Sequence, residues 1–381
     1  MQSTGRLGQL HCGQGGLPGM SGNCADMPGS CTGWSAVDPD ARLTRRCGKV
    51  RESNDLIHLH GDTFLDTEHK ALAALFMPHH VYKQDALESG EFKFVHYTSA
   101  ESAMHIIKNR QVWMRNAQCM NDFMELEHGY ECLIEAYNSD PEGKKFQAVI
   151  ESAHPGLPKD IAQLFDSWMP HLRNSVFIAC LSEHPPDEDN YGRLSMWRAY
   201  GGSQPVALVL NNTPFLSDTS LLGVFSTPVI YQEVEDFRAE FGKLASRLEQ
   251  AKDILVQMGR DNLRNTLFEL IKIYVLGTKH PGFSEEREWR VFYTPELGRS
   301  EHVESEIVSV KGVPQEVHKV PLRDIPEIDF HGATIPDLLH RVIIGPSDQQ
   351  IVMGQTFKKI LTGTGCEDVD SRVHYSGIPL R

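Results

Sequence analysis

The sequence has no apolar run approaching the ~18 residues that a helix needs to cross a bilayer. Glycine, proline and polar residues also interrupt every apolar window near the N-terminus, so no signal peptide is indicated. We therefore expect a soluble, cytoplasmic protein that does not associate with a membrane.

Recognisable metal and nucleophile motifs are missing as well. The eight cysteines form no CxxC pair, and the chain contains no P-loop, HExxH or EF-hand pattern. The HLHGD segment at 58–62 resembles the start of a binuclear metal site, but Thr63 stands where a histidine would be expected to follow. Cys180 and Ser182 do not lie in a GxSxG elbow. We expect no metal.

Basic residues are fewer than acidic ones, 37 against 51, which gives a formal net charge of −14. The first 50 residues carry 5 basic and 3 acidic side chains, a charge of +2, so residues 51–381 carry −16. This acidic body argues against nonspecific binding to nucleic acid, because phosphate contacts need clustered Lys or Arg. It does not exclude a nucleic acid that is held by a local basic patch.

Composition and patterning divide the chain into three parts. Residues 1–50 hold 10 of the 31 glycines, 4 of the 8 cysteines and no phenylalanine, which predicts a disordered Gly/Cys-rich extension. Residues 51–90 form a short helical lead-in. Beyond residue 91, short strands mix with helices of uneven length and show no regular βαβ rhythm. This pattern predicts a single α+β domain over 91–381.

The first candidate site lies in a predicted strand that enters a helix, VHYTS at 95–99. Alternation places His96 and Thr98 on one face of the strand and Tyr97 on the other. A histidine and a hydroxyl that share a pocket can bind a ribose or a phosphate. A half-buried strand with a serine helix cap explains the same residues without a function.

The second candidate site is EREWR at 286–290. If this segment is a strand, Glu286, Glu288 and Arg290 point to one face. Carboxylates placed in this way suit chemistry at a sugar, because a carboxylate stabilises an oxocarbenium-like carbon. The alternative is an exposed edge strand whose Glu and Arg side chains pair across strands.

Two further motifs have ready structural explanations. Trp197 and Tyr200 lie at i, i+3 in a short predicted helix and could stack on a flat heterocycle, although such a stripe is more often part of a core. In the NDxxE motif at 121–125, an Asn-Asp helix cap is followed one turn later by Glu125. Helix entry accounts for this arrangement.

Four segments occur in a characteristic order: HYTSAESAMHIIKNRQVWM, NDxxE, CLSE followed by MWRAYG, and ExEWR, with SGIPLR at the end. Together they resemble the bacterial family called Domain of Unknown Function 2971, over roughly residues 91–381. More distantly, the HYT strand resembles the H-x-T opening of ADP-ribosyltransferase folds. ExE resembles the catalytic carboxylate motif of several such transferases.

The resemblance implies a split, bent mixed sheet with flanking helices that holds NAD, the substrate, between its halves. It implies that Glu288 is the catalytic carboxylate and that Glu286 orients the acceptor. His96 would bind a ribose of NAD and belong to the catalytic set, with Thr98 supporting it.

The remaining cofactor contacts follow from the same resemblance. Tyr97 or Tyr200 would stack on the nicotinamide, and Ser182 would line the central strand. Arg290 completes the expected NAD-binding set.

The implied activity is cleavage of the nicotinamide–ribose bond and transfer of ADP-ribose to an acceptor, such as a protein or a nucleic acid. An NAD glycohydrolase would use water instead. A non-catalytic module that binds or senses a nucleotide is an alternative from another class. A metal-dependent nuclease would need clustered ligands, and the acidic loop at 187–189 is more simply a solvated turn.

Overall fold

The computed structural model describes residues 67–379 apart from 120–122, 218–221 and 311, and these residues belong to one unit of the chain. The predicted Gly/Cys-rich extension, the HLHGD segment and the cap candidates Asn121 and Asp122 lie outside the described residues. So do the side chains of residues 123–125.

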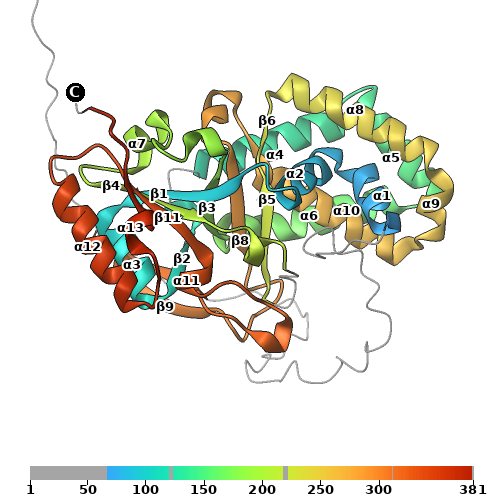
Figure 1. The fold of residues 1–381 in the computed structure, drawn as a ribbon. Helices are drawn as coiled ribbons and strands as arrows, with labels where there is room; N and C mark the ends of the chain where they lie inside the picture. Colours follow the sequence, from blue (N-terminus) through green and yellow to red (C-terminus); the bar gives the residue numbers. More distant parts are fainter. Residues whose placement is uncertain (1–66, 120–122, 218–221, 311, 380–381) are drawn as a thin grey trace, which may run out of the picture. The chain divides into compact units, whose positions relative to one another are not determined.

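Ten strands in the described part form one mixed sheet, which confirms the predicted α+β class (Figure 1). Their bounds are β1 Lys93–Ser99, β2 Gln111–Asn116, β3 Phe177–His184, β4 Pro205–Leu210, β5 Val224–Pro228, β8 Glu288–Tyr293, β9 Glu304–Val310, β10 Val313–Pro321, β11 Leu339–Ile344 and β12 Val373–Tyr375. The order is β12-β11-β4-β1-β3-β2-β10-β9, while β8 pairs with β3 and β5. Only β11 and β12 pair in parallel within this sheet.

The sheet forks at β3. One edge of β3 pairs with β8 along most of its length. The other edge is shared, because Ser182 pairs with Val95 of β1 while Ile178 pairs with Arg115 of β2. The backbone around Cys180 therefore faces the gap between β1 and β2, and the sheet divides into two arms at this point.

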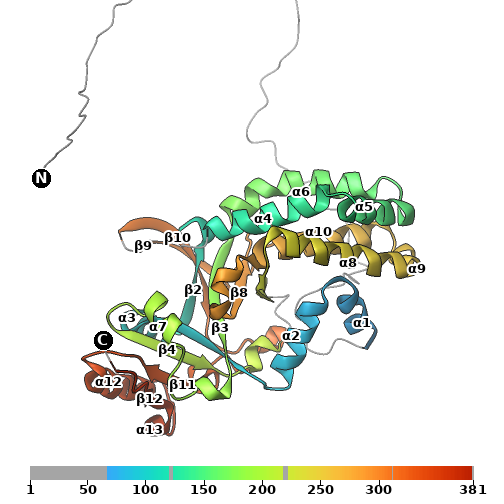
Figure 2. The same ribbon diagram turned by 90° about the horizontal axis from the view of Figure 1, so that it is seen from above.

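Helices cover both faces of the sheet (Figure 2). The helices with at least six residues are α1 Thr67–Phe76, α2 Pro78–Glu88, α3 Ala100–Asn109, α4 Phe123–Asn138, α5 Glu142–Ala153, α6 Leu157–Asn174, α7 Leu194–Tyr200, α8 Val234–Gln250, α9 Lys252–Gln257, α10 Arg260–Gly277 and α12 Gln350–Gly363. The shorter ones are α11 Ile335–Leu338 and α13 Val369–Arg372. None of the described helices is long and apolar enough to cross a membrane.

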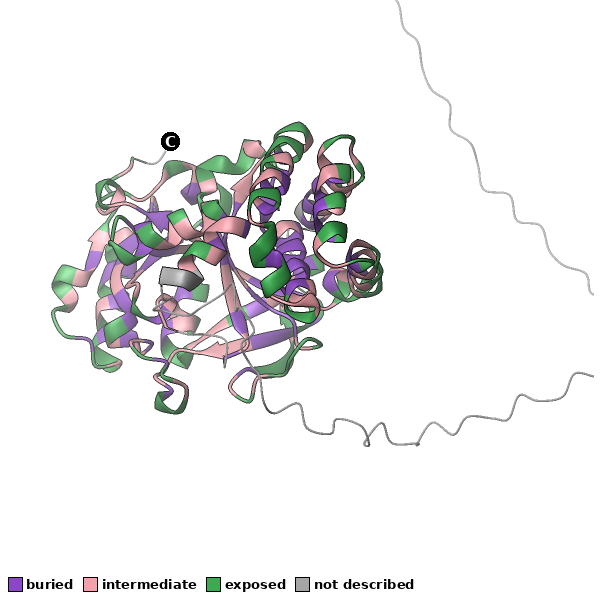
Figure 3. Ribbon diagram, turned by 90° about the vertical axis from the view of Figure 1, so that its right-hand side faces the viewer, coloured by how far each residue is buried: buried purple, intermediate pink, exposed green. Residues whose placement is uncertain are grey.

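The pairing of the antiparallel strands shows which side chains point to the same face of the sheet, and therefore which helices pack on that face. Helices α4, α5, α6, α8 and α10 form one core with Ile178 and Phe292, which are cross-strand partners. Helix α7 packs Met196 and Trp197 against Val95 on the same side of the sheet. Helices α3 and α12 pack on the other side, against β4 and β11. Buried residues line the sheet and the inner sides of the helices (Figure 3).

A separate two-stranded parallel sheet consists of β6 Ile230–Tyr231 and β7 Thr278–Lys279. Strand β6 follows β5 of the large sheet in the chain. Strand β7 follows α10 directly, so the end of this long buried helix delivers Lys279 to the sheet. The side chain of Lys279 is 1 % exposed. Burying an ammonium ion is costly unless carboxylates surround it, which directs attention to its partners.

Candidate functional site

Strand register separates the predicted site residues into two groups. Ser182 pairs with Glu288 across β3 and β8, and with Val95 across β3 and β1. Cross-strand partners point to the same face, whereas adjacent residues alternate. Ser182 and Glu288 therefore share one face of the sheet, and His96 and Thr98 point from the other.

A buried cluster of opposite charges surrounds Lys279. Its Nζ donates to Glu286 Oε2 at 2.6 Å and to Glu288 Oε2 at 2.9 Å. Since both distances share Nζ, the two carboxylate oxygens lie no farther apart than the sum of 2.6 and 2.9 Å, or 5.5 Å. Arg290 Nε donates to the other oxygen of Glu288 at 3.0 Å. We call these four residues the Lys279 cluster.

The two carboxylates reach Lys279 through a turn rather than a continuous strand. The prediction that Glu286 belongs to the strand is wrong, because it ends the 3-10 helix η4 Pro281–Glu286 and β8 begins at Glu288. Arg287 between them has a left-handed backbone with φ 43°, a conformation that costs free energy in a residue other than glycine. This turn directs Glu286 and Glu288 to the same ammonium group.

Hydrogen bonds fix the Lys279 cluster from several elements. Tyr200, which is 40 % exposed, donates its hydroxyl to Glu286 Oε1 at 2.8 Å. The Glu288 backbone N–H donates to Tyr231 Oη at 2.8 Å, and Arg290 Nη1 donates to the Leu276 carbonyl at 2.8 Å. The cluster thus joins α7, α10, β6 and β8, with Glu286 and Tyr200 on its outer side.

The charges of the cluster keep Glu288 ionised. Burial by itself raises the pKa of this carboxyl, but the Arg290 guanidinium and the Lys279 ammonium outweigh burial, and a hydrogen bond with Cys180 adds to their effect. The net result lowers the pKa of Glu288 from 4.5 to about 2. Such a group cannot supply a proton near neutral pH, but it can stabilise positive charge.

Acidification should release the stabilisation that Glu288 provides. The pKa is lower in the folded protein, so this contribution is complete above about pH 4.5 and falls as the pH approaches 2. We expect urea unfolding between about pH 3 and 6 to show a weaker pH dependence for Glu288→Gln than for the wild type. Glu235→Gln, at an exposed position on α8, should follow the wild type. Parallel curves for Glu288→Gln and wild type would contradict this assignment.

His96 bridges the fork in the sheet. Its Nδ1 lies 3.1 Å from the Cys180 carbonyl oxygen, and since a carbonyl only accepts, Nδ1 carries the proton and donates. Burial is the main cause that lowers the pKa of His96, against the opposing effect of this hydrogen bond. His96 also lines a largely apolar cavity of about 130 Å³, together with Leu181, Val291 and other residues of that face.

The other residues predicted to contact the cofactor differ in how far they are exposed. Tyr97 is 6 % exposed, accepts a hydrogen bond from the Arg193 backbone N–H and packs edge-on against Trp197 at 4.8 Å between ring centroids. Ser182 is 3 % exposed on the Glu288 face. Tyr97 and Trp197 therefore belong to a core, whereas Tyr200 remains partly exposed beside Glu286.

Sequence reasoning missed Lys279 and Tyr231, although both contact Glu288. Neither stands in a motif, because each is brought to Glu288 by the β6–β7 pair rather than by spacing along the chain. The available signal was a lysine two residues after the apolar end of helix α10. Among the described residues, no group of three or more His, Cys, Asp or Glu side chains is placed to hold a metal ion.

One segment of the chain is similar to a known protein family. Residues 196–291 match the model of a family described as Protein of unknown function (DUF2971). This DUF2971 segment runs from α7 to β8 and contains all four members of the Lys279 cluster and Tyr200. The match supports the resemblance to this family over the segment that holds MWRAYG and ExEWR; the other motifs lie outside the matched residues. No curated protein and no solved structure matches the chain significantly.

Proposed function

We propose that this protein is an ADP-ribosyltransferase-like enzyme that cleaves the nicotinamide–ribose bond of NAD and transfers ADP-ribose to an acceptor. The observation that carries the proposal is the pair of carboxylates, Glu286 and Glu288, with oxygens within 5.5 Å of each other around one buried lysine. A fixed, ionised carboxylate suits a reaction in which positive charge develops at a sugar carbon.

In the proposed reaction, the bond between C1′ of the ribose and the nicotinamide nitrogen breaks, and its electron pair leaves with nicotinamide. Glu288 stabilises the positive charge that develops at C1′. Glu286, which is closer to the surface and hydrogen-bonded to Tyr200, orients the acceptor. The acceptor forms the new bond to C1′ from the opposite side and releases its proton to Glu286 or to water.

The forked sheet supports an ADP-ribosyltransferase-like fold, in which two arms of a sheet hold NAD between them. His96 and Thr98 lie on the face opposite to Glu288, so we leave them out of the proposed contacts with the reacting ribose. The hydrogen bond from His96 to the Cys180 carbonyl supports a role in positioning β3, which carries Ser182 to the Glu288 face. Tyr200 is the proposed stacking surface.

Glu286→Gln is the direct test. Glu286 lies at the end of a 3-10 helix and not in the sheet, so the substitution leaves the strand pairing of the sheet in place. We expect the purified wild type to release nicotinamide from labelled NAD, and Glu286→Gln to do so about 10²-fold more slowly. Glu285→Gln changes the exposed neighbouring carboxylate and should match the wild type. Equal rates for wild type and Glu286→Gln would contradict the role given to Glu286. No nicotinamide release with protein and nucleic-acid acceptors supplied would refute the enzyme.

Product analysis separates the acceptors. Free ADP-ribose as the main product indicates water and therefore an NAD glycohydrolase. ADP-ribose attached to protein or nucleic acid indicates transfer.

One observation favours a non-catalytic nucleotide-binding module as a second candidate. Both oxygens of Glu288 already hold cationic partners, and the residue is only 4 % exposed. A module of this kind would be stabilised thermally by NAD or ADP-ribose and would release no nicotinamide. An enzyme would show both effects.

A further inference from the structure

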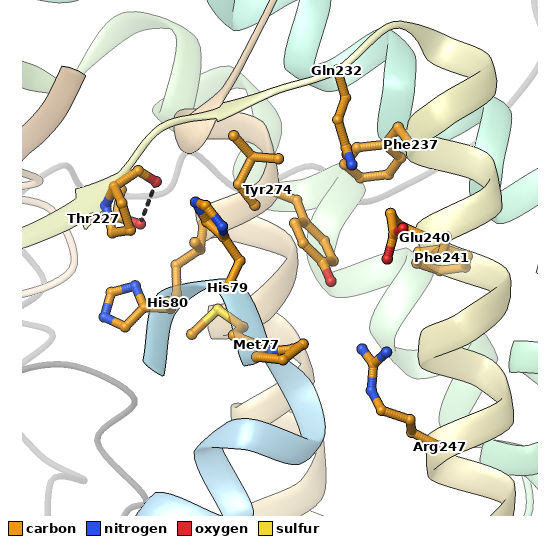
Figure 4. A pocket seen from close by; sticks show the side chains of 14 residues that line it. Met77, His79, His80, Thr227, Gln232, Phe237, Glu240, Phe241, Arg247 and Tyr274 are labelled. Atoms are coloured by element: carbon orange, nitrogen blue, oxygen red, sulfur yellow. Dashed lines mark hydrogen bonds between the residues drawn. The ribbon is translucent and has the colours of Figure 1, made fainter. Parts of the chain in front are cut away.

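A second cavity, of about 300 Å³, lies between helices and has none of the four residues of the Lys279 cluster in its lining (Figure 4). The first turn of α2, the inner sides of α8 and α10, and the chain from β5 to β6 enclose it. Its lining residues are Met77, Pro78, His79, His80, Thr227, Pro228, Ile230, Gln232, Phe237, Glu240, Phe241, Arg247, Ile273 and Tyr274. This volume lies at the lower end of the range for small-molecule sites.

Arg247 brings a guanidinium group to this cavity. Its Nε donates to the Leu75 carbonyl at 3.1 Å, which fixes the side chain. Among the described residues, no carboxylate forms an ion pair with Arg247. The guanidinium points into the cavity, and the Tyr274 hydroxyl points toward the same space from α10 (Figure 4). A half-buried cation without an anionic partner has unused donors for a ligand.

Two more features favour an anionic group at this place. Nε2 of His79 is buried and has no hydrogen-bond partner in the described part of the chain. Helix α2 has no side-chain cap at Met77, and its first turn borders the cavity, so the positive end of the helix dipole faces the same space. Burial is the main cause that lowers the pKa of His79, which leaves a neutral imidazole able to donate one hydrogen bond.

The remaining walls are mainly apolar and restrict the kind of anion. Met77, Phe237, Phe241 and Ile273 are buried core residues that also line the cavity. Glu240 is an exposed residue of α8 whose carboxylate is turned toward Tyr274 (Figure 4), and it repels a second negative charge. A doubly charged phosphate is therefore disfavoured relative to a single carboxylate that carries an apolar body.

We propose that this cavity is a binding site for a small monocarboxylate with an apolar, preferably aromatic, body. Arg247 binds the carboxylate, the Tyr274 hydroxyl donates a further hydrogen bond, and the body packs against the phenylalanines of α8. His79 lies across the cavity, on the side of Thr227 (Figure 4). The cavity adjoins the Lys279 cluster, because Thr227 pairs with Arg290 and the Gln232 backbone N–H donates to the Lys279 carbonyl. The four residues of the cluster do not line it, and the proposal does not rest on NAD chemistry.

The test measures binding to the full chain by calorimetry and thermal shift. The probes are benzoate, phenylacetate, indole-3-acetate and octanoate, with acetate and inorganic phosphate as polar comparisons. We expect at least one apolar carboxylate to bind with millimolar or better affinity and to bind more tightly than acetate or phosphate. Arg247→Gln should weaken that binding about tenfold or more, because it removes a charge-assisted hydrogen bond.

Matched variants separate binding from folding. Arg238→Gln changes an exposed arginine of the same helix and should leave the affinity unchanged. Tyr274→Phe removes one hydroxyl and keeps the ring, so it should weaken binding several-fold in a folded protein. The proposal is overturned if no apolar carboxylate binds, if phosphate or acetate binds equally well, or if Tyr274→Phe and Arg247→Gln both bind like the wild type.

Discussion

Replacing Lys279 with methionine should lower the free energy of unfolding by about 3 to 5 kcal/mol, which is the usual cost of removing one partner from a buried ion pair. Methionine nearly preserves the volume of the side chain, so the cost reflects charge more than packing. Without the ammonium group, Glu286 and Glu288 lose the cation that they share at 2.6 and 2.9 Å. Urea unfolding measured near neutral pH gives the value.

Lys272 offers a matched control for this substitution. It is also buried, at 3 % exposure, but its partner Glu269 is 32 % exposed and lies at the rim. After Lys272→Met, the Glu269 carboxylate can turn toward water, so we expect a smaller cost than for Lys279→Met. Equal costs would show that the Lys279 cluster has no special energetic role.

A double substitution shows whether the charges are coupled. Glu288→Gln in the Lys279→Met background removes one of the two carboxylates that lose Lys279 as a partner. We therefore expect the double variant to be more stable than the sum of the two single effects predicts. Additive effects would contradict direct coupling across the 2.9 Å contact between Lys279 and Glu288.

Replacing Trp289 with alanine should lower the free energy of unfolding by about 3 to 5 kcal/mol, the range for truncating a large buried aromatic residue. Trp289 is 1 % exposed and packs edge-on against Phe94 at 5.1 Å between ring centroids. Its Nε1 donates to Glu183 Oε1 at 3.0 Å, and Lys83 pairs with the same carboxylate. Removing the indole opens a cavity and takes one donor from a mostly buried carboxylate.

Trp113→Ala is the control for this change. Trp113 lies on β2 and is 37 % exposed, so its loss should cost about 1 kcal/mol or less. Both variants can be compared by urea unfolding. A cost for Trp289→Ala as small as that of Trp113→Ala would mean that the core around β8 closes over the missing ring.

Local signals allowed most elements to be predicted from the sequence. Alternation of apolar residues placed β1, and Ser99 caps α3 as expected, accepting from the Ser102 backbone N–H at 3.2 Å. Gly259, with φ 77°, separates α9 from α10. Strand β9 has mostly exposed side chains, so it has little apolar alternation to reveal it.

The site was predicted only in part. Alternation along one strand shows which of its side chains point to the same face, but only the register between strands shows which side chains of different strands share a face. Within β8, the prediction that Glu288 and Arg290 share a face is confirmed by their hydrogen bond. The placement of His96 relative to Glu288 depended on the pairing of Val95 with Ser182. A shift of that pairing by one residue would have put both on one face.

The sequence by itself determined the α+β class, the positions of most strands and the two carboxylates of ExE, because these depend on local periodicity and residue chemistry. Only the tertiary structure decided that Lys279, a residue in no motif, holds both carboxylates, and that His96 points away from them. It also decided that Arg247 and Tyr274, on different helices, face one cavity. Such contacts join residues far apart in the chain, and they follow from packing and strand register rather than from spacing.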